Sequence, residues 1–197
     1  IQSIGSRSTQ GHRLELLDSQ YAYATSPFLG QLWVYDVTGS TPVLVDTATV
    51  SPFGSDHVAF AGDRAYVAAL SRLRMLDVSD PSDPQPSSTR RTFERTTGVT
   101  LHGTTLTVGM EGATMADLDV STPAVPVASS VWLGSDQTTL GRAAVFGTTR
   151  YIPGGEDGFH VLDLSSPANP VYVRTAATTG WAAAAAVFGG ALVVVHS

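Results

Sequence analysis

The sequence predicts an all-β protein, a β-propeller of four-stranded antiparallel blades with four complete repeats and an incomplete fifth. Two observations predict it. One short motif, an aspartate followed by an apolar residue, Ser or Thr, and then proline, recurs at intervals of 41, 42 and 44 residues. Each interval also holds four short apolar runs separated by turn residues. A four-stranded repeat of about 40–45 residues has the size of one propeller blade.

The motif is clearest in the second repeat, where Asp77 opens DVSDPSDP, and it recurs as DVSTPAVP from Asp119 and DLSSPANP from Asp163. A looser copy, DVTGSTP, begins at Asp36. We expect each aspartate to end the third strand of its blade and to accept a backbone N–H two residues on, in an Asx turn. The prolines then mark where strand pairing stops. The four aspartates are therefore interpreted as structural turn residues.

The first, second and fourth strands follow from the same register. In the second repeat, strands are expected at 57–61 and 65–68, with Gly62 between them. Glycine recurs at this turn as Gly103, Gly147 and Gly189. A fourth run follows the prolines, as at 43–50 and 171–178. The five alanines at 182–186 have the best helix propensity in the chain, but the repeat register predicts a strand there.

These residues resemble the LVIVD-repeat family of bacterial and archaeal β-propeller repeats. The resemblance rests on the glycine, the Ala-Tyr-Val strand and the Asp-Val-Ser-Asp-Pro turn, and it is clearest at 62–84 and 147–171. It implies a propeller fold in an exported or cell-surface protein, and it supplies no catalytic residues. The first repeat departs from the pattern, because it lacks the glycine and one proline.

We expect a single β-propeller domain over 1–197, either as the whole protein or as part of a longer chain. Its repeats fall at about 1–50, 51–93, 94–133, 134–178 and 179–197. The last repeat has only two strand-like runs, and its third strand would lie beyond Ser197. Because an open sheet edge is a liability, we expect either that the chain continues past Ser197 or that another protein chain donates a strand to the last blade.

Composition limits the partners. The net charge of −6 argues against a nucleic-acid surface, and no apolar stretch is long enough to insert into a membrane. The chain has no cysteine, so disulfides play no part. The sequence from Ile1 has no signal-peptide pattern, so we expect either that processing has removed one or that the chain is a piece of a longer protein. The expected location is extracellular or at the cell surface, by analogy with the family.

Propeller ligands usually bind at the mouth of the central channel, which is lined by the links between blades and the loops from second to third strands. The channel-mouth candidates for ligand binding are Asp56, His57, Glu111, Arg142, Glu156, Asp157 and Trp181.

The favoured function is non-enzymatic: an extracellular or cell-surface module for protein interaction or structural support, without cofactor or metal. The alternative is a channel-mouth hydrolase or lyase acting on a glycan or another polymer, with Glu111 paired with Glu156 or Asp157 as in glycoside cleavage. A metal site built on His12, His57 and an acid has weaker support, because no closely spaced His pair occurs. A calcium-stabilised scaffold is a further alternative, although one carboxylate per blade cannot supply the six to eight oxygens that calcium needs.

Overall fold

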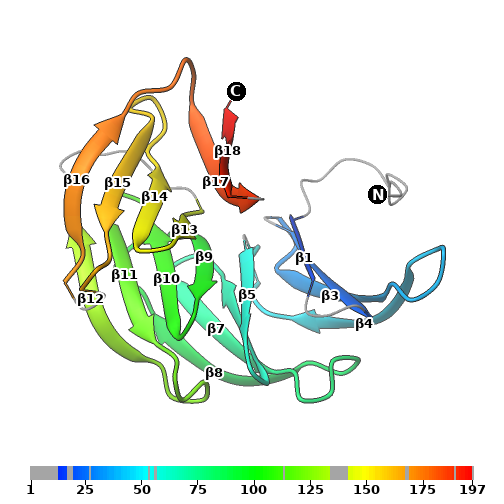
Figure 1. Cartoon of the computed structure of the whole chain (residues 1–197). Helices are drawn as coiled ribbons and strands as arrows, with labels where there is room; N and C mark the ends of the chain where they lie inside the picture. Colours follow the sequence, from blue (N-terminus) through cyan, green and yellow to red (C-terminus); the bar gives the residue numbers. More distant parts are fainter. Residues whose placement is uncertain are drawn as a thin grey trace. The chain divides into compact units, whose positions relative to one another are not determined.

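The computed structural model describes residues 13–16, 20–26, 28–52, 54–55, 57–112, 114–133, 142–166, 169–188 and 190–196. Its regular elements are antiparallel β-strands (Figure 1). No helix long and apolar enough to cross a membrane occurs among these residues. The chain divides into two compact units, Ile1–Thr92 and Phe93–Ser197. The division falls between the second and third predicted repeats. Whether the whole chain is one domain stays a prediction.

The first unit holds two four-stranded sheets in which neighbours in sequence are neighbours in space. The first sheet consists of β1 (Arg13–Leu16), β2 (Tyr21–Thr25), β3 (Gln31–Asp36) and β4 (Val43–Thr49). The second sheet consists of β5 (His57–Ala61), β6 (Arg64–Ala68), β7 (Arg72–Asp77) and β8 (Gln85–Arg91).

The second unit holds two further four-stranded sheets and one two-stranded sheet. The third sheet consists of β9 (Thr96–His102), β10 (Thr105–Met110), β11 (Thr114–Asp119) and β12 (Val127–Leu133). The fourth consists of β13 (Ala144–Phe146), β14 (Thr149–Pro153), β15 (Phe159–Asp163) and β16 (Val171–Ala176). The last consists of β17 (Ala182–Phe188) and β18 (Ala191–His196). The all-β, four-stranded blade prediction is confirmed, and so is the strand predicted for the alanine run.

The recurring glycines make the tight turns between first and second strands. Gly62, Gly103 and Gly147 each have φ +57° and open a two-residue hairpin loop. A glycine with positive φ at the first loop position fits the type II′ turn, whose twist matches that of paired strands. Gly189, the predicted fourth member, lies outside the described residues.

Each complete blade carries a β-bulge at one place that the sequence did not reveal. The pairing of third and fourth strands shifts register just before the motif aspartate in all four blades, between Val34/Tyr35, Met75/Leu76, Asp117/Leu118 and Val161/Leu162. A bulge bends a strand and increases its twist. It therefore curves the outer edge of each blade.

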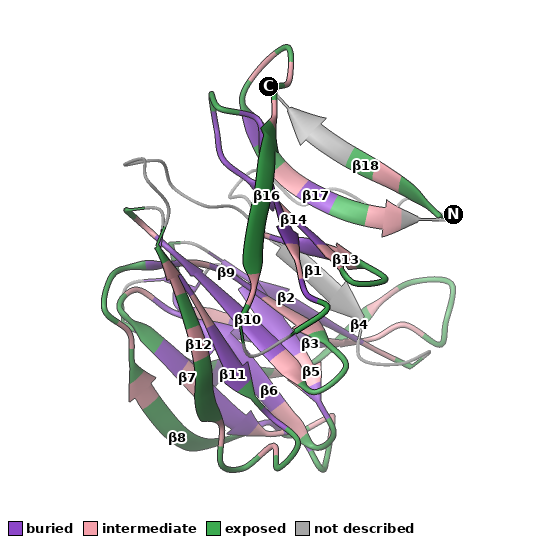
Figure 2. Cartoon of the chain, turned by 60° about the vertical axis from the view of Figure 1, so that its left-hand side comes forward, coloured by how far each residue is buried: buried purple, intermediate pink, exposed green. Residues whose placement is uncertain are grey.

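Burial follows strand position within the blade (Figure 2). The second strands, such as β6 and β10, are largely buried, whereas the fourth strands β8, β12 and β16 are largely exposed. In the first unit, Val34 and Ala48 of the first blade pack in one cluster with Val58, Ala65 and Leu76 of the second. Blade-to-blade packing of this kind removes the apolar second strands from water.

Candidate functional site

Several predicted site residues meet where the fourth blade adjoins the last sheet. The loop between β14 and β15 pairs with the start of β17: Gly155 N–H donates to the Ala182 carbonyl at 3.2 Å, and Ala182 N–H to the Gly155 carbonyl at 2.8 Å. A parallel bridge joins Arg142 to Ala184. We call the surface formed by Arg142, Gly155, Glu156, Asp157 and Trp181 the junction site. Four of these five are predicted site residues, so the structure brings together four of the seven.

Glycines allow this loop to close against its neighbours. A Cβ placed on Gly155 would lie 3.1 Å from Cζ2 of Trp181, so the indole covers the loop backbone directly. A Cβ on Gly154 would lie 2.6 Å from Nε2 of His160. A Cβ on Gly158 would collide with the carbonyl oxygen of Ala176. The loop is therefore held between Trp181 on one side and the fourth blade on the other.

The junction site offers one aromatic surface beside two acids. Trp181 is 44% exposed, and Glu156 and Asp157 are exposed at the tip of the loop. An accessible indole can stack on a planar or sugar-like group, and the carboxylates can accept hydrogen bonds from it. The indole and the two acids suit a polar neutral or cationic group, and Arg142 adds one cation to the same site.

The other three candidates lie elsewhere or cannot be placed. Glu111 forms an ion pair with Arg95 at 3.4 Å, and both side chains are partly exposed. Such a pair contributes little to stability, but it does engage the carboxylate that the hydrolase alternative would use. His57 is 4% exposed at the start of β5, in the first unit. Asp56, like His12, lies outside the described residues. The hydrolase or lyase alternative stays a prediction.

A metal-ligand cluster is absent from the part of the chain that the structure describes. No group of three or more His, Cys, Asp or Glu side chains is placed there to hold an ion.

The four motif aspartates make the hydrogen bonds that the sequence predicts. Each is the last residue of a third strand, and its Oδ1 accepts a backbone N–H from the residue two positions on, at 2.8–2.9 Å. The residue directly after each aspartate donates its own N–H to the turn before the second strand. Val78, for example, donates to the Asp63 carbonyl at 2.8 Å. The motif therefore ties the end of the third strand to the first hairpin of the blade.

Hydrogen bonds lower the pKa of these four carboxyl groups. For Asp36, Asp77 and Asp163 the hydroxyl of the following Thr or Ser is the largest cause, followed by its backbone N–H. For Asp119 the backbone N–H of Ser121 is the largest cause. Both donors favour the ionised form over the neutral one.

Acid should therefore loosen the turns. A pKa lower in the folded than in the unfolded chain gives stability that is complete above the ordinary value of 3.8 and is lost as pH falls through the folded value. We expect the melting temperature to fall as the pH is lowered below about 4. The double variant Asp119→Asn with Asp163→Asn should show a shallower fall, because the amide oxygen still accepts the N–H but does not titrate. Glu156→Gln, on an exposed loop, is the control. An identical slope in the double variant and wild type would contradict the assignment.

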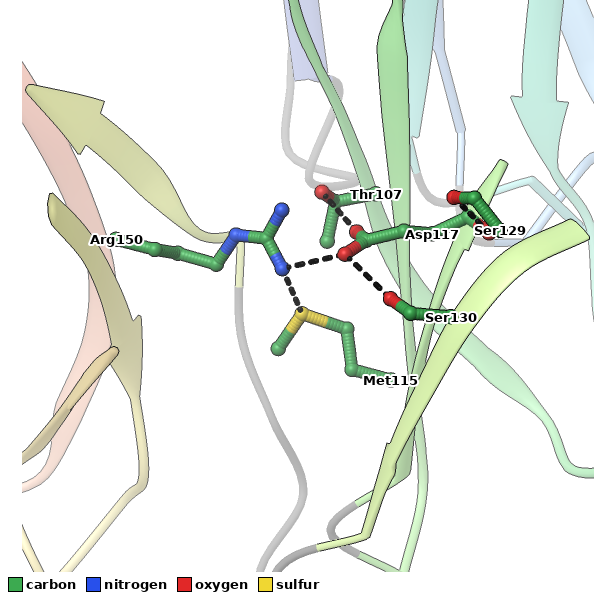
Figure 3. A network of polar contacts seen from close by, with 6 residues as sticks. All are labelled: Thr107, Met115, Asp117, Ser129, Ser130 and Arg150. Carbon is green, nitrogen blue, oxygen red and sulfur yellow. Dashed lines mark hydrogen bonds and ion pairs between the residues drawn. The ribbon is translucent and has the colours of Figure 1, made fainter. Parts of the chain in front are cut away.

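A buried ion pair links the third and fourth blades, and the sequence analysis missed it (Figure 3). Arg150 Nη1 lies 2.9 Å from Asp117 Oδ2, and both side chains are 2% exposed. Asp117 also accepts hydrogen bonds from the hydroxyls of Thr107 at 2.7 Å and Ser130 at 3.0 Å. Arg150 further approaches Met115 Sδ at 3.5 Å. The charge pair is thus sealed from water with several partners.

Register across the repeats would have revealed this pair. Asp117 stands two residues before its motif aspartate, where the first blade has Val34, and Arg150 stands three residues after the turn glycine, where the second blade has Ala65. Val34 and Ala65 pack in one apolar cluster. The signal for a buried ion pair is that two opposite charges stand at positions that are apolar in another pair of blades.

His160, also on a third strand, is 5% exposed and is packed among aromatic rings. Its Nδ1 lies 3.1 Å from Thr175 Oγ1, and its ring lies 5.7 Å from that of Trp132 and 6.4 Å from that of Tyr172. Nε2 makes no hydrogen bond with the described residues. His160 therefore acts as a packed residue beneath the junction-site loop.

Comparison with protein families decides the nature of the repeat. The LVIVD repeat model matches residues 54–91 and 142–178, the second and fourth blades. The chain therefore carries LVIVD repeats in two of its blades. The family resemblance stated from the motif is thereby confirmed. No curated protein sequence matches the chain.

Solved structures similar to this LVIVD-repeat chain include propellers. The β-propeller domain of Cps50 (Swd1) from Myceliophteria thermophila has a TM-score of 0.68 at 11% identity over 86% of this chain and 59% of that one. The computationally designed Ika8 protein has a TM-score of 0.68 at 12% identity, over 92% and 54%. A functionally unknown protein from Desulfotomaculum acetoxidans has 0.65 at 14%, over 83% and 55%. This chain thus spans between 54% and 59% of their lengths, and at such identities the likeness shows the fold alone.

Proposed function

We propose that this LVIVD-repeat chain is a non-enzymatic interaction or structural module outside the cell that binds another protein through the free edge of its last sheet. The propeller fold and the repeats support the role of an interaction scaffold. The extracellular or cell-surface location rests on the resemblance to exported repeat proteins. The observation that carries the proposal is the two-stranded last sheet.

Among the described residues, the last sheet has two strands where each of the other sheets has four. In the four complete blades the second strand pairs with both the first and the third strand. The equivalent strand β18 pairs with β17, and among the described residues no strand pairs with its other edge. An unpaired edge is a template for an added strand, whose main-chain hydrogen bonds give affinity and whose alternate side chains give specificity.

The complete blades indicate what that strand looks like. The third strands β3, β7, β11 and β15 run antiparallel to the second strands, have five or six residues and end on aspartate. Their buried positions hold apolar residues such as Leu32, Leu73 and Leu162. A partner strand of this chemistry, short and apolar with a terminal Asp turn, would complete the last blade in the same register.

A peptide with the sequence of residues 72–91, which makes the third and fourth strands of the second blade, tests the proposal. We expect the fluorescently labelled peptide to bind the chain with a micromolar dissociation constant, measured by anisotropy. The same peptide with Pro in place of Arg74, whose N–H faces the second strand in the second blade, should bind at least about tenfold more weakly, because proline cannot donate to a strand ladder.

Matched variants of the protein localise the binding. Val193→Lys on β18 should weaken binding, since a charge on an edge strand opposes pairing. Val45→Lys on β4, at a similar exposure of 43% against 47%, should leave it unchanged. Equal binding of the parent and proline peptides, or equal loss in the two lysine variants, would contradict the proposal.

A further inference from the structure

A small pocket lies between the first and second blades, in the first unit. Its volume is about 160 Å³, and it opens where the outer strand β4 meets β7 and the bulged strand β8. The lining residues are Thr49, Val50, Arg74, Met75, Leu76, Pro86, Ser87, Ser88 and Thr89.

Its size limits the ligand. Drug-sized ligands occupy pockets of about 300–1,000 Å³. An engineered cavity of about 150 Å³ in another protein holds one benzene molecule. The pocket therefore suits a single six-membered ring with a small substituent.

Its chemistry combines one cation, hydroxyls and an apolar floor. The half-buried Arg74 donates from Nη1 to Thr89 Oγ1 at 2.7 Å. Met75 and Leu76 are buried. Of the described residues that line the pocket, none carries a carboxylate. A guanidinium stacks on aromatic faces and binds carboxylates through its planar fork.

In the second unit, the residue equivalent to Arg74 is His160, and an aromatic ring of the chain itself lies beside it. Arg74 and His160 each stand three residues before their motif aspartate, and each contacts the Thr paired with it on the fourth strand, Thr89 or Thr175. The ring of Trp132, from the preceding blade, lies 5.7 Å from that of His160.

The preceding blade in the first unit has no such ring. Trp132 pairs with Met115, and the residue in the same place on β4 is Ala48, which pairs with Leu32. Leu162 and Leu76 are equivalent, since each directly precedes its motif aspartate. Trp132 packs against the cluster that contains Leu162, and Ala48 belongs to the cluster that contains Leu76. Ala48 is followed by Thr49 and Val50, which line the pocket, so the pocket lies beside the place that corresponds to the indole of the other unit.

We propose that this pocket is a binding site for a small aromatic carboxylate. The aromatic ring lies beside Arg74, much as the ring of Trp132 lies beside His160 in the other unit. The carboxylate meets the Arg74 guanidinium and the hydroxyls of the β8 bulge. This site is independent of the strand-binding edge of β18, which belongs to the other unit.

Benzoate is the probe, with binding followed by saturation-transfer NMR on the full chain. We expect saturable binding in the millimolar range or tighter, and no saturable signal from acetate at the same concentrations. Arg74→Met should weaken benzoate binding at least about tenfold, the scale of one charge-assisted contact. Ala48→Trp should weaken it by crowding the neighbouring lining residues Thr49 and Val50 with an indole.

A second blocking variant keeps the test decisive. Ser88→Phe, on the exposed strand β8, narrows the pocket without entering the core, and it should abolish binding even if Ala48→Trp does not fold. Circular dichroism and melting temperature check the fold of each variant. The proposal is overturned if benzoate gives no saturable binding, if acetate binds as tightly, or if folded Ser88→Phe and Arg74→Met bind benzoate as wild type does.

Discussion

Replacing Asp117 by Asn is expected to lower the free energy of unfolding by about 3–5 kcal/mol, the usual cost of removing one member of a buried ion pair. The carboxylate faces Arg150 at 2.9 Å with both side chains 2% exposed. Asn leaves the guanidinium charged, buried and without its counter-charge. Arg150→Met should cost a similar amount, because it leaves Asp117 in the same position. Chemical denaturation followed by tryptophan fluorescence measures both.

The double variant Asp117→Val with Arg150→Leu shows whether the single variants lose stability because one buried charge is left unpaired or because a side chain is lost. Val34 and Leu106 are buried at the equivalent positions of other blades, so an apolar pair suits this place in the fold. We expect the double variant to recover most of the loss and to lie within about 2 kcal/mol of wild type, since an apolar replacement of a buried ion pair is often neutral. Single variants that cost under about 1 kcal/mol, or a double variant as unstable as their sum, would show that the pair is not sealed from water.

Replacing Gly158 by Ala is expected to lower the free energy of unfolding by about 3 kcal/mol and to displace the junction-site loop. Gly158 has φ +89°, where an L-residue is strained by about 1–2 kcal/mol. Its Cβ would also collide with the Ala176 carbonyl and lie 2.9 Å from Ala177 Cα, both of them backbone atoms that cannot rotate away. Overpacking of this kind typically costs a further 1–3 kcal/mol or so.

Gly147→Ala is the matched control. Gly147 also has positive φ, but a Cβ there meets nothing within 4 Å. We expect a loss of about 1 kcal/mol, from backbone strain alone. The fluorescence of Trp181, whose ring lies against Gly155, should change in Gly158→Ala and not in the control. Equal losses in the two variants would mean that the loop is free to move away from β16.

The repeated motif predicted the blades well because its chemistry is local. An aspartate that accepts an N–H two residues on, and a glycine that opens a two-residue loop, act within a few residues of themselves, so Asp77 and Gly62 can be identified from sequence. The repeat register predicted a strand at 182–186 although the five alanines there have high helix propensity. The strand forms because tertiary pairing outweighs a weak local preference.

The site was harder to predict because it depends on contacts between blades. Glu111 looked like a partner for Glu156 or Asp157, yet its carboxylate faces Arg95. His57 was a channel-mouth candidate at the start of an innermost strand, and its side chain is 4% exposed. The Asp117–Arg150 pair could be recognised only by comparing equivalent positions of different blades. The bulge before each motif aspartate left no sequence signal except Pro86, a residue tolerated at bulges and edges.

Hydrogen–deuterium exchange of the full chain, with and without the 72–91 peptide, tests the central claim most directly. If β18 is the binding edge, its amides should gain protection when the peptide is added, because they become hydrogen-bonded in a sheet. The outer strands β8, β12 and β16, which are also exposed, should not change. Unchanged exchange at β18, or equal protection on the outer strands, would contradict the claim that this propeller binds its partner at the edge of the last sheet.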